Sequence, residues 1–490
     1  MSEESQSTKE EKLKKIQDLK EKGIDIYPYS YEVDARLSDL KNEYGSLENE
    51  QKSGKVVRVA GRVLSLRAMG KILFMNLMDE DGEIQLFFRE NELNDRFTTA
   101  QMIDIGDIVG VTGEVFKTRT GELSIWISDF AILNKSITGL VDSYYGLKDI
   151  ELKYRNRSMD MIVNKESRDI LKKRFEIIAK VREFMVGEGF LEVETPVLQV
   201  VYGGAAAKPF ETHHHKLDMK MYMRVAPEQY LKRVMIGGME AVFEIGKCFR
   251  NENIDRTHNP EFTMMEAYRA YEDYNYVMDM MERLFEKLCL DMFGTTTVKC
   301  QGHEINFARP WKRLTVKNAL QELAGINVDE MSDEQLIEMA GKTDKRMNRA
   351  NRGEAILVLF EEHCEEKLIQ PTHVIDYPKE STAFCKAHRE DPELIERFES
   401  FICGREVSNG YSELNDPVLQ RKLLEDQVRL AEQGAEETWG MLDEDFLDAM
   451  DVGLPPAAGI GIGIDRLVMI LLDQASIRDI IYFPTMKPNK

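Results

Sequence analysis

Residues 241–268, AVFEIGKCFRNENIDRTHNPEFTMMEAY, contain two runs of alternating residues on either side of a charged loop. This alternation predicts two antiparallel strands joined as a hairpin, because successive side chains of a strand point to opposite faces of a sheet. The hairpin would present Arg250 and Glu252 on one arm, and Glu266 and Tyr268 on the other. Opposed charges at this density either pair with one another on a surface hairpin or hold a highly charged ligand. Composition alone leaves both interpretations open.

Strand and helix patterns surround this hairpin. A helical pattern over 166–190 precedes it, and further strand patterns occur at LEVETPVL (191–198), MYMRVA (221–226) and HVIDYP (373–378). Segregated strands and helices predict an α+β domain, built on an antiparallel sheet flanked by helices. Residues 328–370, rich in Glu and Lys, are predicted to be an inserted helical segment.

The N-terminal part of the chain has a different periodicity. From Lys55 to Leu133, apolar and polar residues alternate with a period of two, and turn signals separate about five short runs. This pattern predicts a small β-barrel of the oligonucleotide-binding (OB-fold) kind, although an SH3-like barrel fits the composition equally well. Residues 9–22 predict a helix whose lysines either face solvent or contact an RNA backbone. We therefore expect a helical extension over 1–50, an OB-fold domain over 51–140 and the α+β domain over 141–490.

Charge and cysteine content limit the possible functions. The chain has 65 Lys and Arg against 87 Asp and Glu, a net charge of −22, which argues against non-specific coating of nucleic acid. A local basic face for RNA remains possible. The six cysteines are widely spaced without a CxxC pair, as is typical of a reducing compartment. No segment has the pattern of a signal peptide or a membrane span, so we expect a cytoplasmic protein.

A glycine-rich stretch, AAGIGIGIDR (457–466), follows near the C-terminus. It is not a dinucleotide-binding fingerprint, because its glycines lead into Asp-Arg and an apolar helix. Taken alone, these glycines could simply allow a strand and a helix to pack closely.

Together these segments resemble the three signature motifs of class II aminoacyl-tRNA synthetases. VREFMVGEGFLEVETPVL (181–198) is similar to motif 1, FRNE (249–252) with the loop to Phe262 to motif 2, and GIGIGIDR (459–466) to motif 3. Five longer segments resemble the lysyl branch of the class: GGAAAKPF (203–210), RVAPEQYLKR (224–233), THNPEFTMMEAY (257–268), GREVSNGYSELNDP (404–417) and GLPPAAGIGIGIDR (453–466). The resemblance extends from about residue 10 to the C-terminus.

The resemblance implies a ligase that activates lysine with ATP and transfers the lysyl group to the 3′-terminal adenosine of tRNA(Lys). It also implies a homodimer formed through motif 1, and Mg²⁺ acting with ATP. Asparaginyl or aspartyl specificity and a non-catalytic RNA-binding paralogue are the alternatives. A carboxylate at Glu413 would repel an aspartate side chain, and a decayed paralogue would be expected to lose some of the charged site residues.

By motif match, the nucleotide site would be formed by cations and carboxylates. Two anions must meet in this reaction, so a positive clamp is required. The resemblance assigns ATP to Arg250, Glu252, His258, Phe262, Glu399 and Arg466, with Arg250 and Arg466 as catalytic residues. Arg250 would hold the α-phosphate and the substrate carboxylate, and Phe262 with Arg466 would sandwich the adenine. Glu399 and Glu406 match the magnesium carboxylates of the family.

The lysine site would neutralise two ammonium groups. The resemblance assigns it to Gly204, Glu228, Glu266, Tyr268, Asn409, Tyr411 and Glu413. Glu228 and the Gly204 backbone would receive the α-amino group, and Glu413 with Tyr268 the ε-ammonium. In the barrel, Arg67, Phe74, Gln85 and Glu122 match residues that stack on and read the central anticodon uridine. Without the resemblance, the strand pattern around Phe74 would favour a core position.

Three positions depart from the family pattern. Thr257 stands where an arginine often precedes the histidine of HNPEF, and Arg256 lies one position earlier. The usual Ser-Pro is Thr382-Ala383, within a segment that faintly resembles asparaginyl enzymes. The usual Arg-Tyr before motif 1 is Arg157-Ser158.

Overall fold

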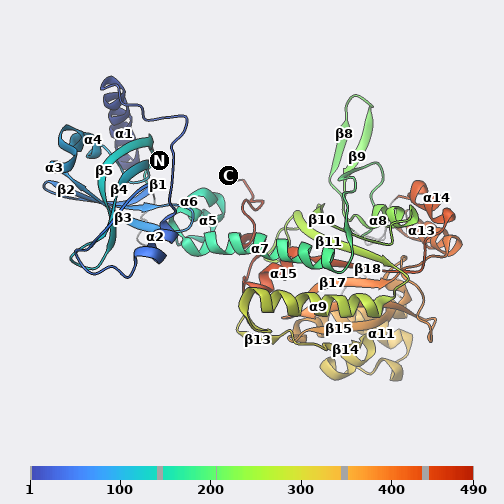
Figure 1. Cartoon of the computed structure of the whole chain (residues 1–490). Coiled ribbons are helices and arrows are strands. Elements are labelled where there is room, and N and C mark those ends of the chain that lie inside the picture. The colour runs from blue at the N-terminus through green and yellow to red at the C-terminus, as the bar shows by residue number, and fades with distance from the viewer. Residues whose placement is uncertain (1–2, 141–146, 206, 344–350, 433–440, 489–490) are drawn as a thin grey trace. The chain divides into compact units, whose positions relative to one another are not determined.

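The computed structural model describes residues 3–140, 147–205, 207–343, 351–432 and 441–488. The chain divides into two compact units, Met1–Lys165 and Glu166–Lys490, and each is described by itself (Figure 1). The expected domain boundary at 140/141 adjoins residues 141–146, which lie outside the described residues.

The first unit contains a closed β-barrel. Its strands follow the order β1 (Lys52–Met69), β2 (Ile72–Met78), β3 (Glu83–Arg89), β5 (Leu123–Asn134) and β4 (Ile108–Lys117). All neighbours are antiparallel except β3 and β5. On β3, Ile84, Leu86 and Phe88 are buried inside the barrel, while Gln85 and Phe87 between them are only half-buried. The period of two thus closes a barrel with one apolar lining, which confirms the predicted OB-fold.

Helices accompany this barrel. They are α1 (Glu3–Glu21), α2 (Leu37–Tyr44), α3 (Glu90–Leu93), α4 (Phe97–Ala100), α5 (Ile150–Arg155) and α6 (Arg157–Val163). The buried Leu19 of α1 and Leu37 and Leu40 of α2 belong to the same core as the barrel lining.

The second unit is built on an eight-stranded sheet of order β14-β15-β16-β17-β18-β11-β10-β6. The strands are β6 (Leu191–Glu192), β10 (Ala241–Phe249), β11 (Glu261–Ala270), β14 (Lys312–Thr315), β15 (Thr372–Pro378), β16 (Leu394–Ile402), β17 (Arg405–Ser412) and β18 (Ala457–Gly463). The strands from β15 to β10 are antiparallel, as predicted, and the sheet ends in parallel pairs at β14–β15 and β6–β10. The α+β class is therefore confirmed, with the qualification that both edges of the sheet are parallel.

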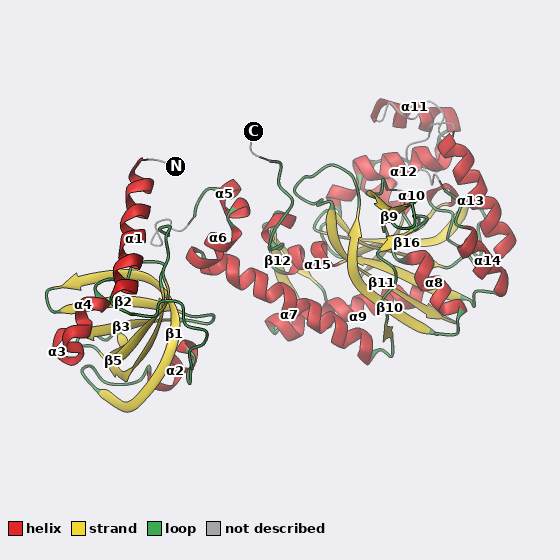
Figure 2. Cartoon of the chain, turned by 90° about the horizontal axis from the view of Figure 1, so that it is seen from above, coloured by secondary structure: helices red, strands yellow, loops and turns green. Residues whose placement is uncertain are grey.

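Helices cover both faces of this sheet (Figure 2). The long helices α7 (Lys165–Gly187) and α9 (Tyr274–Phe293), with α15 (Ile464–Leu471), share one core with Phe243 of β10. The others are α8 (Glu228–Ile236), α10 (Val316–Ala319), α11 (Asp333–Thr343), α12 (Arg352–His363), α13 (Pro417–Glu432) and α14 (Glu444–Val452). Leu231 of α8 belongs to a second core with Val242 of β10. Because the neighbours Val242 and Phe243 point to opposite faces of the strand, the two cores lie on opposite faces of the sheet.

Two small sheets complete the unit. One has the order β7 (Leu198–Gln199), β9 (Met219–Met223) and β8 (Glu211–His214), and the other pairs β12 (Thr297–Cys300) with β13 (His303–Asn306). Figure 1 shows the β8–β9 hairpin projecting from the unit. Across the described ranges, none of the helices combines the length and apolar character that a membrane span requires.

Candidate active site

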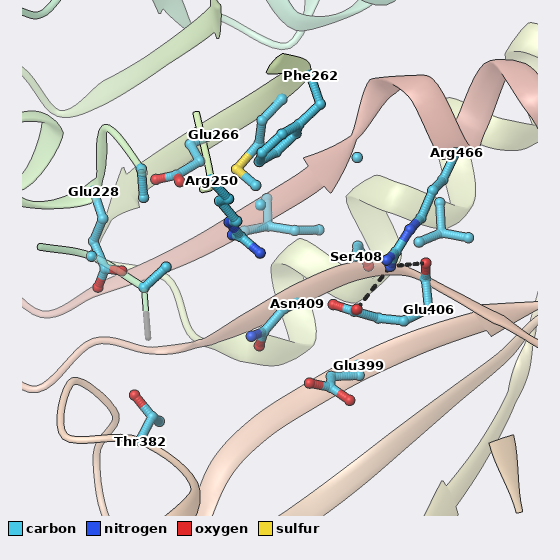
Figure 3. Close-up of a pocket in the computed structure, with 18 of the residues that line it drawn as sticks. Glu228, Arg250, Phe262, Glu266, Thr382, Glu399, Glu406, Ser408, Asn409 and Arg466 are labelled. Carbon is cyan, nitrogen blue, oxygen red and sulfur yellow. Dashed lines mark hydrogen bonds and ion pairs between the residues drawn. The ribbon is translucent and has the colours of Figure 1, made fainter. Parts of the chain in front are cut away.

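A cavity of about 430 Å³ opens on the Val242 face of the sheet in the second unit. It is bounded by the β10–β11 hairpin, by β16 and β17, and by the junction of β18 and α15 (Figure 3). Its lining includes Gly204, Glu228, Arg250, Glu252, His258, Phe262, Glu266, Tyr268, Glu399, Glu406, Asn409, Tyr411, Glu413 and Arg466. The structure thus gathers in one cavity every residue that the resemblance assigned to ATP, magnesium or lysine.

The β10–β11 hairpin carries the first group, but its strand is shorter than predicted. Strand β10 ends at Phe249, so Arg250 and Glu252 lie in the loop rather than on the strand. The Arg250 backbone N–H still donates to the Pro260 carbonyl at 2.9 Å, which closes the last rung of the hairpin. The Arg250 guanidinium lies 5.1 Å from the ring centre of Phe262, and its buried Nε has no hydrogen-bond partner. An arginine held in this way has a donor available for an anion.

In Figure 3, Arg466 lies on the side of the cavity away from Glu228, with Arg250 between them. It lies in the first turn of α15, directly after β18, and its Nη1 donates to the Glu406 carboxylate at 2.9 Å and to the Glu406 carbonyl at 2.8 Å. Its Nη2 is 3.2 Å from His258 Nε2, and His258 Nδ1 is 2.8 Å from Asp255 Oδ2. Burial alone would raise the pKa of Asp255. Hydrogen bonds from Thr257 and His258 outweigh burial, so the pKa is lowered to about 2. Asp255, His258, Arg466 and Glu406 therefore form a row in which acidic and basic groups follow one another: carboxylate, imidazole, guanidinium, carboxylate.

Glu399 and Glu406 lie on the adjacent strands β16 and β17. Glu399 accepts a hydrogen bond from the Tyr377 hydroxyl at 2.8 Å and pairs with Arg397. Burial raises the pKa of Glu399 more than Arg397 lowers it. Burial alone would raise the pKa of Glu406. The neighbouring Arg466 favours the charged carboxylate, and the pKa of Glu406 is lowered overall.

These two carboxylates fit a magnesium site that is completed by the substrate. Carboxylate oxygens suit Mg²⁺, which usually takes one or two protein carboxylates and fills its remaining positions with water and phosphate. The described residues contain no group of three or more His, Cys, Asp or Glu able to enclose an ion. Two carboxylates on adjacent strands are a donor set that Mg²⁺ can share with phosphate oxygens and water.

The end of the cavity around Glu228 and Glu413 is acidic and buried. Glu228, Glu266 and Glu413 are 4%, 5% and 1% exposed. The Tyr411 hydroxyl donates to Glu228 Oε1 at 2.6 Å, and the Tyr268 hydroxyl donates to Glu266 Oε2 at 2.9 Å. Burial, reinforced by repulsion from Glu228, raises the pKa of Glu266 and of Glu413 to about 8. Three carboxylates in this space form a site for cations.

Two glycines make room for this arrangement. A Cβ added to Gly459 would lie 2.1 Å from Glu413 Oε1 and 2.5 Å from the Tyr268 ring. Gly204 has a φ of +89°, and a Cβ there would lie 3.1 Å from the Glu228 Cβ. Gly459 of the motif 3 segment thus leaves room for Glu413 and Tyr268, and Gly204 leaves room for Glu228.

Two charged residues that contact the side chains lining the cavity were not expected from the sequence; Arg397 also lines it, whereas Lys232 does not. Lys232 of α8 has its Nζ 2.6 Å from both Glu228 Oε1 and Glu413 Oε2. Arg397 of β16 pairs with Glu399 and donates from its Nε to Asn409 Oδ1 at 3.2 Å. Local spacing held a signal for each: Lys232 follows Glu228 by one helical turn, and Arg397 lies two residues before Glu399 on the same strand face.

The positions that depart from the family pattern have different locations. Thr257, Thr382 and Ala383 line the cavity. Arg256 is not among the lining residues; it is exposed, and its carbonyl accepts a hydrogen bond from the Ile477 backbone at 2.8 Å. Arg157, in the first unit, is buried and pairs with Asp160 at 2.9 Å.

The four barrel residues lie together on the outer surface of the first unit. Arg67 on β1 is the register partner of Phe74 on β2, and Glu122 is exposed at the start of β5. Phe74 is half-buried between the fully buried Leu73 and Met75, so its ring lies outside the barrel core. The Gln85 side-chain carbonyl accepts a hydrogen bond from the Ser124 hydroxyl at 2.9 Å.

Phe74 begins a row of aromatic rings that continues through Phe87 to Trp126. The Phe87 ring is 5.1 Å from Phe74 and 5.1 Å from Trp126. Lys52 and Arg89 lie over the Trp126 ring at 4.4 Å and 5.1 Å. Flat rings with cations beside them are the combination that binds single-stranded nucleic acid.

Comparison with known proteins gives similarity along nearly the whole chain. Residues 149–487 match the family of tRNA synthetases class II (D, K and N), and residues 57–133 match the OB-fold nucleic acid binding domain. The chain is 46% identical over 487 residues to a lysine–tRNA ligase of Clostridium novyi, covering 98% of this chain and 94% of that protein. It is 45% identical over 480 residues to a lysine–tRNA ligase of Methanoculleus marisnigri, covering 97% and 94%. A third such ligase, from Clostridium perfringens, is 46% identical over 496 residues, covering 99% and 98%.

Proposed function

Since the chain belongs to the class II tRNA synthetases (D, K and N), within the family of the lysine–tRNA ligases, we propose that this cavity performs both steps of lysine transfer. In the first step a carboxylate oxygen of lysine attacks the α-phosphorus of ATP, and pyrophosphate leaves. In the second, a ribose hydroxyl of the 3′-terminal adenosine of tRNA attacks the lysyl carbonyl, and AMP leaves. The first step needs no general base, because the attacking carboxylate is already ionised.

Arg250 is the proposed clamp for the two reacting anions. Its unpartnered Nε, and its place between the acidic end and the Arg466 end of the cavity, support this role (Figure 3). Cations fixed before the reaction stabilise charge that develops at the α-phosphate. Glu252, His258, Phe262 and Arg466 would hold the rest of the nucleotide. Glu399 and Glu406 would hold Mg²⁺, which supplies positive charge to phosphate oxygens when bound.

The acidic end of the cavity carries the assignment of lysine as substrate. Glu228 and the Gly204 backbone would bind the α-amino group, and Asn409 would fix the carboxylate. Glu413 would receive the ε-ammonium, with Tyr268 beside it. Tyr411 would pack on the aliphatic stem, while Glu266 lines the site. The buried carboxylates would repel an aspartate side chain, and an asparagine side chain would give Glu413 no ionic partner, so the aspartyl and asparaginyl alternatives are disfavoured.

The barrel is the proposed anticodon reader. Phe74 would stack on a base, and Gln85, Arg67 and Glu122 would contact its edges or the backbone, as readout of unpaired RNA requires. We assign this role to residues 51–140, with residues 1–50 as an N-terminal extension and 141–490 as the catalytic domain.

A homodimer is proposed through the motif 1 region. Several large apolar side chains there are exposed: Phe175 (50%), Val186 (57%), Leu191 (50%), Leu198 (47%) and Val200 (50%). Apolar side chains that gather on one region mark a protein interface more often than free surface. A reducing location, the cytoplasm, is supported by the six cysteines, all of which are free thiols.

The deciding experiment is pyrophosphate–ATP exchange with lysine, aspartate and asparagine, followed by charging of tRNA(Lys). We expect exchange that depends on lysine alone, and lysyl transfer to the tRNA. Exchange driven by aspartate or asparagine would reject lysine as the substrate and assign that amino acid instead. No exchange with any amino acid, from a protein that binds RNA, would favour the non-catalytic paralogue.

A further inference from the structure

Lys232 is a fully buried lysine that does not itself line the cavity but lies behind two carboxylates that do, Glu228 and Glu413. It lies on α8, its side chain is 1% exposed, and its Nζ is 2.6 Å from both Glu228 Oε1 and Glu413 Oε2. The rings of Phe384, Tyr411 and Tyr268 surround it at 4.6, 5.5 and 6.0 Å. Burial lowers the pKa of Lys232, but the two carboxylates raise it by more, so the side chain is charged at neutral pH.

The two partners of Lys232 are the carboxylates proposed to bind the two ammonium groups of the substrate. A carboxylate offers about four acceptor positions on its two oxygens, so one ammonium does not saturate it. Lys232 contacts one oxygen of each glutamate. Glu413 Oε1 is buried without any hydrogen-bond partner. Glu413 Oε2 forms a salt bridge with Lys232. Glu228 Oε2 faces Gly204, 3.7 Å from the Cβ that a side chain there would have.

The charges around Lys232 are also matched in number to the substrate. Glu228, Glu266 and Glu413 bring three negative charges when ionised, and Lys232 brings one positive charge. Two negative charges remain, which equals the number of ammonium groups on lysine. Without Lys232, a third cation or proton would be required to neutralise the pocket, because buried unpaired charges are costly.

We propose that Lys232 is a positioning and specificity-determining residue: an internal ammonium that holds Glu228 and Glu413 in place and leaves each one free oxygen for an ammonium group of the lysine substrate. This inference rests on the proposed function of the cavity. It assigns to Lys232 no contact with ATP or with the reacting atoms. The residue therefore acts on substrate affinity through its two partners.

Lys232→Met tests the proposal in the full-length chain. We expect the lysine KM in pyrophosphate exchange to rise by about ten- to a hundredfold, the loss that follows when one charge-assisted hydrogen bond is misplaced. The ATP KM and the rate at saturating lysine should change by less than about twofold, because the lost lysine binding is shared equally by the ground state and the transition state. An unchanged lysine KM would overturn the proposal, as would an equal loss in both KM values.

Lys135→Met is the matched control. Lys135 is also fully buried between two carboxylates, with its Nζ 2.7 Å from Asp104 and 2.5 Å from Asp107, but it lies in the first unit. The Lys135→Met variant should lower the free energy of unfolding without changing the lysine KM. If Lys135→Met raised the lysine KM as much as Lys232→Met, the effect would be one of general destabilisation and the proposal would fall.

A double-mutant cycle with Glu413→Gln measures whether Lys232 acts through its partner. Once Glu413 has lost its charge, Lys232→Met should raise the lysine KM by a clearly smaller factor than it does in the wild type. Full additivity would reject the positioning role. If Lys232→Met fails to bind ATP, Lys232→Gln replaces it, since glutamine keeps a donor without the charge. If that variant also fails to bind ATP, the residue is a structural ion pair only and the proposal is wrong. Absence of lysine-dependent exchange in the wild type would instead reject the proposed function.

Discussion

At the proposed nucleotide end of the cavity, the side chains of Arg466 and His258 are 26% and 51% exposed. At the proposed amino-acid end, those of Lys232 and Glu413 are each 1% exposed. Water screens the charges at the first end, so they can rearrange around a ligand that brings its own charge and metal. At the second end each charge needs a fixed partner before the substrate arrives. The difference indicates that one end is built for charge stabilisation and the other for selection.

The largest effect on lysine activation is expected from Arg250→Ala, which removes the only proposed cation that touches both reacting groups. Exchange should fall by about 100- to 1,000-fold, the cost of losing one donor to developing charge. Arg256→Ala is the control, because Arg256 belongs to the same loop without lining the cavity. Near-normal exchange in Arg250→Ala, with a folded protein, would remove Arg250 from the mechanism.

Glu413→Gln should have the next largest effect and separates the two ends directly. Glutamine keeps the shape but removes the charge that faces the ε-ammonium, so the lysine KM should rise by about ten- to a hundredfold. The ATP KM should stay near the wild-type value, because Glu413 lies at the amino-acid end. Glu393→Gln is a suitable control, since Glu393 is exposed and pairs with Lys379 at 2.7 Å. A loss of ATP affinity without a loss of lysine affinity would show that the proposed assignment of the two ends is wrong.

The pH dependence of the lysine KM should be a moderate effect. The pKa of Glu266 and of Glu413 is raised to about 8 by burial and by repulsion from Glu228, against the attraction of Lys232 and, for Glu266, the hydrogen bond from Tyr268. Both carboxyls therefore carry protons at pH 6 in the empty pocket, and bound ammonium groups must displace them. Lysine affinity should rise between pH 6 and pH 8, by at most about tenfold per pH unit for each proton displaced.

Measurement of the lysine KM and the ATP KM across this range tests the idea. The ATP KM should not change in this way with pH. Glu413→Gln should reduce the change of the lysine KM between pH 6 and pH 8. A lysine KM that is flat from pH 6 to pH 8 would show that the carboxylates are already ionised in the empty pocket.

The smallest effect on lysine activation is expected from Phe74→Ala, in the other unit. Exchange should stay close to the wild type, while tRNA charging should fall by a factor that corresponds to about 1–3 kcal/mol of lost stacking. A tRNA with an altered anticodon should lose less in the variant than in the wild type. The melting curve is the control: an unfolded barrel, or undiminished discrimination between the two tRNAs, would reject the readout role.

The sequence by itself determined the class of each unit. The period-two alternation over 55–133 specifies one apolar face per strand, which closes into a barrel. The residues matched through the motifs also meet in one cavity, because each motif fixes its side chains relative to a strand or helix end. The extent of two strands was overestimated. Alternation continues to Glu252 although the last hydrogen-bonded rung is at Arg250. Of the predicted run 191–198, only Leu191–Glu192 and Leu198 lie in strands.

The tertiary structure alone decided which charges meet. Lys232 is an ordinary member of a helical pattern until the fold brings Glu413 from β17 to within 2.6 Å of its ammonium. Phe74 has the alternation of a core residue, and only the closure of the barrel decides that its ring lies outside. Periodicity reports which face of an element is apolar, because that is a local property of the chain. The pairing and the pKa of buried charges depend on distance and desolvation across elements remote in sequence, and no local pattern contains them.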